Sequence, residues 1–232
     1  MGRTRYLQVM GGESGMNREF ADHSWAAPVT FEDRVFDGYD FSGSNLDNVL
    51  FVRCDFRGSR FGGGISGGVG FFGCNFTDCV FDRFDFRRVS VGADGGDFLR
   101  CQFIRCNFAG RHFERPHFDS CVFDRCRLRN INFNDSTFRR TTFIGKLEDV
   151  TFNGMYRRHD GPHPPIEEVD FSRATLGEFV TFEECDLSSS IPPTGTRFVD
   201  LLYQIDPASP GLVSTGSADR IVLHRRSNPP DS

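Results

Sequence analysis

Large apolar residues recur at every fifth position along much of this chain. The longest unbroken run consists of Phe98, Phe103, Phe108, Phe113, Phe118, Phe123, Leu128, Phe133, Phe138 and Phe143. A small residue usually stands two positions before the large one, as Cys101 stands before Phe103. A period of five fits neither an α-helix, with about 3.6 residues per turn, nor a strand, with a period of about two. Self-similarity at a fixed short period predicts a solenoid built of stacked repeats.

The five-residue register extends beyond this run. It opens at Phe31, continues to Val91, resumes at Phe98 after two inserted residues and reaches Phe152. A break over residues 153–168 follows, and its three prolines are unfavourable for strand pairing. The register then returns at Phe171, Leu176, Phe182 and Leu187, with one extra residue before Phe182. Because the interval from Phe152 to Phe171 is nearly four times the length of one repeat, most of it is expected to form a loop insertion.

Several units share a small residue, then Asp or Asn, then Phe or Leu, as in CNFTD (74–78), CNFAG (106–110) and CDLSS (185–189). These units resemble the pentapeptide-repeat family, and the resemblance covers about residues 29–190. It implies an all-β fold, a right-handed quadrilateral parallel β-helix with one pentapeptide per side and four per coil. Cysteine pairs whose members stand four repeats apart, such as Cys101 and Cys121, independently support this coil length. Twenty-nine positions in register predict about seven coils and a rod on the order of 34 Å long, since stacked strands lie about 4.8 Å apart.

The ends of the chain lie outside the register. Residues 1–28 are expected to form an N-terminal cap or arm, because the first coil of a solenoid needs covering. Residues 191–232 are expected to form a C-terminal cap and a flexible tail. Within them, residues 198–205 should cover the open end of the last coil as a short helix or strand. For residues 219–226 three alternatives stay open, namely a homodimer contact, a pairing strand and disorder.

All eight cysteines stand two positions before a large residue of the register, and no CxxC motif occurs. A free cysteine behaves as a small buried hydrophobe, so we expect reduced structural thiols rather than disulfides or zinc ligands. This usage favours a reducing, cytoplasmic location. The chain contains no run of 18 apolar residues and its N-terminus lacks an apolar leader, so neither a membrane span nor a secretory signal is expected.

A few repeats carry a large residue in the position that is usually small. These residues are Arg34, Tyr39, Phe84, Arg111 and Pro116. An arginine cannot be buried cheaply. We therefore expect these corners of the coil to bulge or to lie at the end of a coil.

A few stretches match catalytic or ligand-binding motifs, but we do not expect them to be functional sites. Residues 62–68 match both G-x-G-x-x-G and G-x-S-x-G, but the register passes through them and no strand-turn-helix context is predicted. His159 and His163 are four residues apart in a proline-rich stretch rather than on a helix, which disfavours a metal site. We expect no catalytic residue, cofactor, metal or small-molecule substrate, and hence no enzyme.

Charge is unevenly distributed. Residues 96–146 contain ten basic and five acidic side chains, whereas residues 147–206 contain four basic and twelve acidic ones. The arginines of the basic segment are Arg100, Arg105, Arg111, Arg115, Arg125, Arg127, Arg129, Arg139 and Arg140. They suggest nucleic-acid binding only weakly, because the aromatic residues are committed to the core rather than to stacking.

The leading hypothesis is a scaffold that binds an unassigned protein partner. The family resemblance implies an alternative, because some members imitate double-stranded DNA and bind DNA gyrase or topoisomerase IV. The candidate phosphate mimics are Glu167, Glu168, Asp170, Glu178, Glu183, Glu184 and Asp186. The loop supplies further candidate contacts in Tyr156, Arg157, Arg158 and His159. A continuous acidic stripe on the rod would favour the DNA mimic, a continuous arginine stripe nucleic acid, and scattered charges the scaffold.

Overall fold

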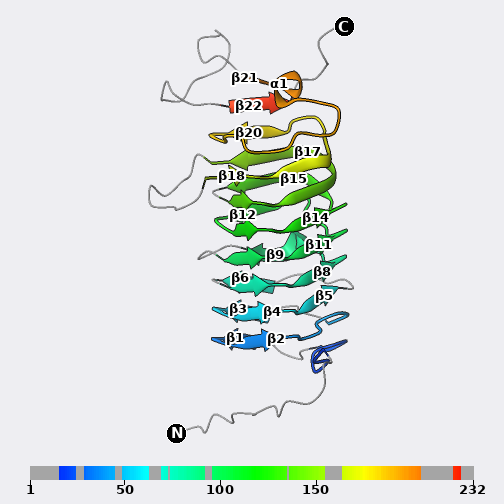
Figure 1. The fold of residues 1–232 in the computed structure, drawn as a ribbon. Coiled ribbons are helices and arrows are strands. Elements are labelled where there is room, and N and C mark those ends of the chain that lie inside the picture. Colours follow the sequence, from blue (N-terminus) through cyan, green and yellow to red (C-terminus); the bar gives the residue numbers. More distant parts are fainter. Residues whose placement is uncertain are drawn as a thin grey trace.

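The computed structural model forms a straight rod of stacked coils, with the N-terminal coil at one end and the C-terminal elements at the other (Figure 1). It describes residues 16–24, 29–44, 49–62, 69–72, 74–91, 96–134, 136–154, 164–204 and 222–225. Among these residues, no helix has the length and apolarity needed to cross a membrane. The fold is an all-β parallel solenoid, as the register predicts.

The strands pair in parallel with the residue one coil further along the chain. Phe31 lies opposite Phe51, and Phe36 lies opposite Phe56. Because the partners in each pair stand four repeats apart in the sequence, four pentapeptides complete one coil. We call each coil a level, and we name the sides by the residues at their centres: side 1 (from Phe31), side 2 (from Phe36), side 3 (from Phe41) and side 4 (Phe86 and its equivalents).

Short strands occupy most sides. Side 1 contains β1 (Val29–Glu32), β3 (Val49–Val52), β6 (Val69–Phe72), β9 (Val89–Val91), β12 (His112–Glu114) and β20 (Thr181–Glu183). Side 2 is a seven-stranded sheet of β2 (Val35–Asp37), β4 (Asp55–Arg57), β7 (Asn75–Thr77), β10 (Asp97–Leu99), β13 (His117–Asp119), β16 (Thr137–Arg139) and β18 (Ile166–Glu167). Side 3 contains β5 (Arg60–Gly62), β8 (Val80–Asp82), β11 (Gln102–Ile104) and β14 (Val122–Asp124).

Longer strands turn corners near the C-terminal end of the rod. They are β15 (Leu128–Asn134), β17 (Thr142–Asn153) and β19 (Asp170–Leu176). β17 pairs with β14 on side 3 and with β15 on sides 4 and 1. Side 4 begins among the described residues with the 3-10 helix η1 (Phe86–Arg88).

The core is a set of phenylalanine ladders. Phe103 is 1% exposed, and its ring stacks on Phe81 below and Phe123 above at centroid distances of 5.0 and 4.6 Å. Neighbours around the same coil meet at steep angles, as Phe103 and Phe108 do at 67°. Aromatic rings favour both arrangements, offset stacked and edge to face. The ladders therefore hold the levels together along the rod and the sides together within each coil.

Most corners are closed by a residue with left-handed backbone two positions after the large one. Gly38 and Gly58 occupy such corners at φ of 66° and 58°, but arginine, aspartate or glutamate occupies many others, such as Arg105 at 52°. The corner N–H donates to a carbonyl of the next level, as Arg105 N does to Asp124 O at 2.8 Å. The backbone of each corner residue is therefore held in place, and so is the position from which its side chain extends.

The two inserted residues after Val91 are confirmed by the pairing, because Phe98 lies opposite Phe76 and is thus displaced by two positions from a regular coil. The predicted end of the loop insertion at residue 168 is wrong. Ile166 pairs with Phe138 in β18 and is 2% exposed, so it is a repeat centre that sequence reasoning missed. The break in the register therefore falls between Gly154 and Pro164, whereas the prolines suggested a longer one.

The large residues in small positions behave in different ways. Arg34 is exposed in the first level, and Arg111 directs its Nη1 to Arg87 O at 2.9 Å, outside the core. Phe84 is buried against Phe86, at the point where η1 replaces a strand. The expectation of a bulge is wrong for Pro116, which is buried just before the regular strand β13.

Both ends of the core are covered. Near the N-terminus the ring of Phe20 stacks on Phe41 and Tyr39, each at 5.5 Å, and Asn17 bridges to Tyr39. Residues 16–24 therefore cover the first coil, while residues 1–15 and 25–28 of the predicted N-terminal cap or arm lie outside the described residues.

At the C-terminal end, α1 (Phe198–Leu201) leads into β21 (Leu202–Gln204), and Leu202 is 4% exposed. β22 (Val222–Arg225) runs antiparallel between β20 and β21. Of the three alternatives for residues 219–226, the structure therefore contains the pairing strand.

All eight cysteines are buried free thiols. Several donate to a carbonyl of the preceding level, as Cys121 Sγ does to Phe98 O at 3.2 Å. Burial raises the pKa of the Cys101 and Cys126 thiols far above the ordinary value. These two thiols fill small inward positions as neutral groups, as their placement in the register predicts.

Replacing a central ring should strongly destabilise the rod. Phe103→Ala is expected to lower the free energy of unfolding by about 3–5 kcal/mol, because it leaves a cavity between two stacked rings. Urea unfolding followed by circular dichroism measures the change. Phe179→Ala is the control, since Phe179 is 72% exposed. Equal small losses in both variants would show that Phe103 is not in the core.

Alkaline conditions should weaken the fold through the buried thiols. An unfolded thiol titrates at about pH 8.5, while the folded pKa is raised, so the stabilisation is complete below that pH and declines as the pH rises. Between pH 7 and about pH 9.5 the loss is about 1.4 kcal/mol for each such cysteine. Urea unfolding at both pH values should therefore give a smaller decline for Cys101→Ala/Cys126→Ala than for the natural chain. The same decline in both proteins would contradict the burial of neutral thiols.

Candidate interaction faces

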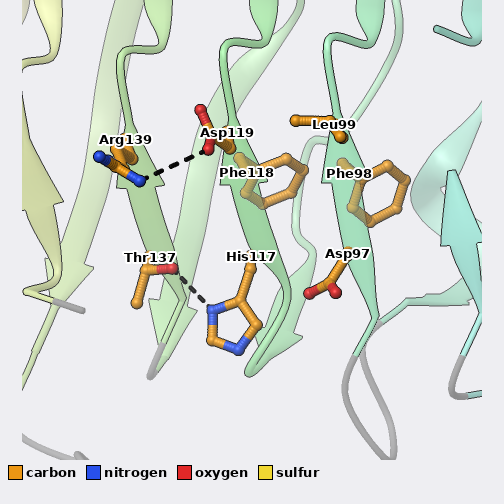
Figure 2. Close-up of a pocket in the computed structure, with 8 residues that line it drawn as sticks. All are labelled: Asp97, Phe98, Leu99, His117, Phe118, Asp119, Thr137 and Arg139. Atoms are coloured by element: carbon orange, nitrogen blue, oxygen red, sulfur yellow. Dashed lines mark hydrogen bonds and ion pairs between the residues drawn. The ribbon is translucent and has the colours of Figure 1, made fainter. Parts of the chain in front are cut away.

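The outward positions of each side form straight ladders, because each pairs with its equivalent one coil away. On side 2, Asp97, His117 and Thr137 form one ladder and Leu99, Asp119 and Arg139 form the next. These six residues line a surface hollow of about 430 Å³ above the buried rings of Phe98 and Phe118 (Figure 2). Residues from three levels therefore meet in one place.

Two polar contacts organise the hollow. His117 Nδ1 and Thr137 Oγ1 are 2.7 Å apart, and the Arg139 guanidinium lies 3.9 Å from Asp119 (Figure 2). Among the described residues, no hydrogen bond or ion pair joins Asp97 to His117. The hollow can therefore receive a polar side chain of a partner, but it contains no base that a carboxylate orients.

Side 2 neutralises much of its own charge. At the corner, Arg100 binds both carboxylate oxygens of Asp78 at 2.7 and 2.8 Å, and this pairing lowers the pKa of Asp78. Arg140 similarly binds Asp119, and Arg139 lies 3.2 Å from Glu167. Exposed pairs of this kind contribute little to stability. Their main effect is to remove net charge from this face.

The structure does not bring the predicted acidic residues into one stripe. Glu167 and Glu168 lie on side 2 and its corner, while Asp170 begins β19 on side 3. Glu178 lies in the turn after side 4. Glu183 and Glu184 follow the centre of side 1. The predicted phosphate mimics therefore surround the last coils on all four sides.

Two of these carboxylates accept hydrogen bonds from backbone N–H groups. Asp170 accepts a hydrogen bond from Ser172 N at 2.7 Å, and Asp186 accepts one from Ser188 N at 2.8 Å. The hydrogen bonds from Ser188 lower the pKa of Asp186. These groups stabilise turns of the rod. The remaining loop candidates, Tyr156, Arg157, Arg158 and His159, lie outside the described residues.

The arginines of the basic segment divide between faces. Arg100, Arg139 and Arg140 belong to the paired ladders of side 2, and Arg115 lies at a corner of side 1. Arg105, Arg125, Arg127 and Arg129 gather on the corner after side 3 and on side 4, where Arg83 and Arg87 join them. Arg111, just past the corner that closes side 4, donates to Arg87 O through its Nη1. This arginine patch consists of Arg83, Arg87, Arg105, Arg111, Arg125, Arg127 and Arg129. Sequence reasoning missed the patch, although counting the register through the insertion after Val91 would have aligned Arg83 with Arg105.

The strand pairing and the repeats identify the family. A family model described as a pentapeptide repeat region matches residues 96–159, and one described as pentapeptide repeats matches residues 31–64. This chain is a pentapeptide-repeat protein. No curated protein sequence matches it.

Solved structures of other pentapeptide-repeat proteins resemble the rod. Full-length QnrB1, a plasmid-mediated fluoroquinolone resistance protein, is 15% identical, with 72% of this chain and 88% of that chain covered and a TM-score of 0.24. The trypsin-treated form of a QnrB1 variant gives a TM-score of 0.30 at 15% identity, with 72% and 86% covered. HetL, involved in heterocyst differentiation regulation in the cyanobacterium Nostoc sp. strain PCC 7120, is 10% identical, with 78% and 93% covered and a TM-score of 0.25. At these values the fold assignment rests on the strand pairing of this chain.

Proposed function

We propose that this pentapeptide-repeat protein is a non-enzymatic scaffold that binds another protein through the outward-facing sides of its coils. One observation carries the proposal: parallel stacking aligns outward residues into ladders, and different sides have different chemistry. Side 2 contains ion-paired acids and arginines, whereas side 3 contains aliphatic residues such as Val80 and Val122. A rigid, repeated surface of this kind suits recognition of an extended partner.

The inward residues are not available for recognition. Most repeats place their phenylalanine or leucine and their small residue in the core. Specificity must therefore come from the remaining outward positions. Protein interfaces combine an apolar centre with a polar rim in which arginine is common, and aliphatic side chains next to arginines can supply both.

Site-specific photo-cross-linking tests this function. A photoreactive phenylalanine analogue at Asn132, Thr77, Gln102 or Ala109 places one probe on side 1, 2, 3 or 4. In cells that naturally produce the protein, we expect one defined protein adduct from one or two of these positions. Adducts from none of the four positions, or adducts to nucleic acid alone, would contradict a protein-binding scaffold.

One observation favours imitation of double-stranded DNA as a second candidate function. Side 2 and its corner contain an acid at most levels, namely Asp37, Asp55, Asp78, Asp97, Asp119, Glu167 and Glu168. Asp37 and Asp97 form no ion pair among the described residues. An acidic ladder would be attracted to the basic DNA-binding surface of a type II topoisomerase such as DNA gyrase or topoisomerase IV. The arginines bound to Asp78 and Asp119 weaken this ladder, so protein scaffolding is the first proposal.

A gyrase supercoiling assay, with and without a quinolone and at two salt concentrations, tests the DNA-mimic function. The mimic should inhibit supercoiling or protect it from the drug, and Asp37→Lys/Asp97→Lys should weaken the effect about tenfold or more. Asp82→Lys/Asp149→Lys, which reverses two acids away from side 2, is the matched control and should leave the effect unchanged. No effect of the natural chain at micromolar concentration would rule out this function for the enzyme tested.

A further inference from the structure

Side 3 presents aliphatic side chains on successive levels. Val80 and Val122 flank Gln102 in one outward ladder, and Ile104 and Ile144 alternate with Asp82 and Asp124 in the other. The four aliphatic residues are half-buried rather than covered. They belong to β8, β11, β14 and β17, which lie one above another along the rod (Figure 1). Together they form a zigzag apolar stripe parallel to the rod axis.

The corner beside this stripe is a row of arginines. Arg83, Arg105 and Arg125 are exposed, and each has left-handed backbone at φ of 53°, 52° and 50°. Their N–H groups donate to Ile104, Asp124 and Ile144 carbonyls, each at 2.8 Å. These hydrogen bonds fix the arginine backbones at the spacing of stacked strands, about 4.8 Å per level.

The row retains unpaired positive charge. Arg83 lies 3.8 Å from Asp82, and Arg125 binds Asp124 at 2.9 Å. Arg105, between them, forms no ion pair among the described residues, because Ile104 stands where its neighbours have aspartate. On the adjoining side 4, Arg127 and Arg129 are exposed, and neither forms an ion pair among the described residues, although Glu148 lies opposite Arg129 in the next strand. The positive charge is therefore centred on Arg105 and continues onto side 4.

We infer that side 3 and its arginine corner form a docking surface for an acidic amphipathic helix of a partner protein, lying along the rod axis. This inference deepens the proposed protein-binding function and rests on it. A helix rises about 1.5 Å per residue, so acids at every third or fourth position are about 4.5–6 Å apart. That spacing matches the arginine row, level by level. An aliphatic stripe on the same helix would pack against Val80, Ile104 and Val122.

The surface fits a protein helix better than a nucleic acid. Asp82 and Asp124 lie within it and would repel a continuous phosphate chain, whereas an amphipathic helix can direct its acids to the arginine corner and its aliphatic residues to side 3. Among the described residues, Phe179 is the exposed aromatic residue, and it lies two levels beyond Arg127 in the side 4 register. The arginine row therefore has no exposed ring beside it on which a base could stack. The aliphatic stripe has no role in binding phosphates, whereas it gives a helix its apolar contact.

The chain contains its own matched control. Leu99 and Arg100 follow Phe98 on side 2 just as Ile104 and Arg105 follow Phe103 on side 3. Arg100 is bound by Asp78, whereas Arg105 is free of ion pairs among the described residues. The same two substitutions can therefore be made on either side, and their effects on the fold can be compared directly.

The test uses a fluorescent synthetic peptide of about 20 residues, long enough to span about 30 Å as a helix, with leucines on one stripe and glutamates at every third or fourth position beside it. Fluorescence anisotropy measures its binding to the full chain and to Ile104→Asp/Arg105→Glu and Leu99→Asp/Arg100→Glu. Urea unfolding checks that both variants are folded. A scrambled peptide of the same composition and a single-stranded oligonucleotide are the comparison probes.

We expect saturable binding that weakens as salt is raised, and a loss of about tenfold or more in the side 3 variant alone. Equal losses in both variants, equal binding of the scrambled peptide, or no binding at millimolar peptide would overturn the inference. Tighter binding of the oligonucleotide, sensitive to the same variant, would also overturn it and assign the surface to nucleic acid. If photo-cross-linking then captures a protein from another side but not from Gln102, the scaffold function stands without this surface.

Discussion

The structure depends on the limited interior volume that each side of the coil provides for side chains. One large ring and one small residue fill the interior per side, and a second large side chain would overfill it. This limit explains why valine, cysteine, serine or threonine stands two residues before most rings. It also explains the stacking, because rings that repeat at the same place on each level must lie face to face along the rod. The strand pairing, the corner geometry and the burial of the thiols all follow from this division of the interior between one large and one small residue per side.

Because the inward positions are filled in the same way at every level, the sides of the rod differ in their outward-facing residues. Stacking places residues that are a full coil apart in the sequence next to one another. It separates Leu99 and Arg100, beside the acids of side 2, from Ile104 and Arg105, beside the aliphatic residues of side 3. Two nearly identical sequence fragments thus acquire different surroundings, one neutralised and one able to receive acidic groups. Under the proposed function, a partner is selected by the side of the rod that it contacts, rather than by the total charge.

Much of the fold could be predicted from the sequence, because a period of five with a small residue before each ring has few physical solutions. The register predicted the rings at the core, the place of the cysteines and the insertion after Val91. Ile166 was missed because the prolines just before it suggest a loop, although proline is compatible with the small position before a repeat centre. The candidate faces were harder to predict. Charges summed over a linear segment average four sides of the coil, so the ladders on side 2 and the arginine row beside side 3 appear only when the levels are stacked.

The alignment of corner residues on successive levels can be measured directly by cross-linking. Arg105→Cys/Arg125→Cys places two exposed thiols one level apart on the same corner, within the Cα separation of about 4.4–6.8 Å that a disulfide requires. Arg100→Cys/Arg125→Cys places them on different corners, while the native cysteines are buried and should stay reduced in both variants. Mild oxidation followed by mass spectrometry should show a disulfide in the first variant and free engineered thiols in the second. A disulfide in the second variant, or none in the first, would contradict the ladders on which this account rests.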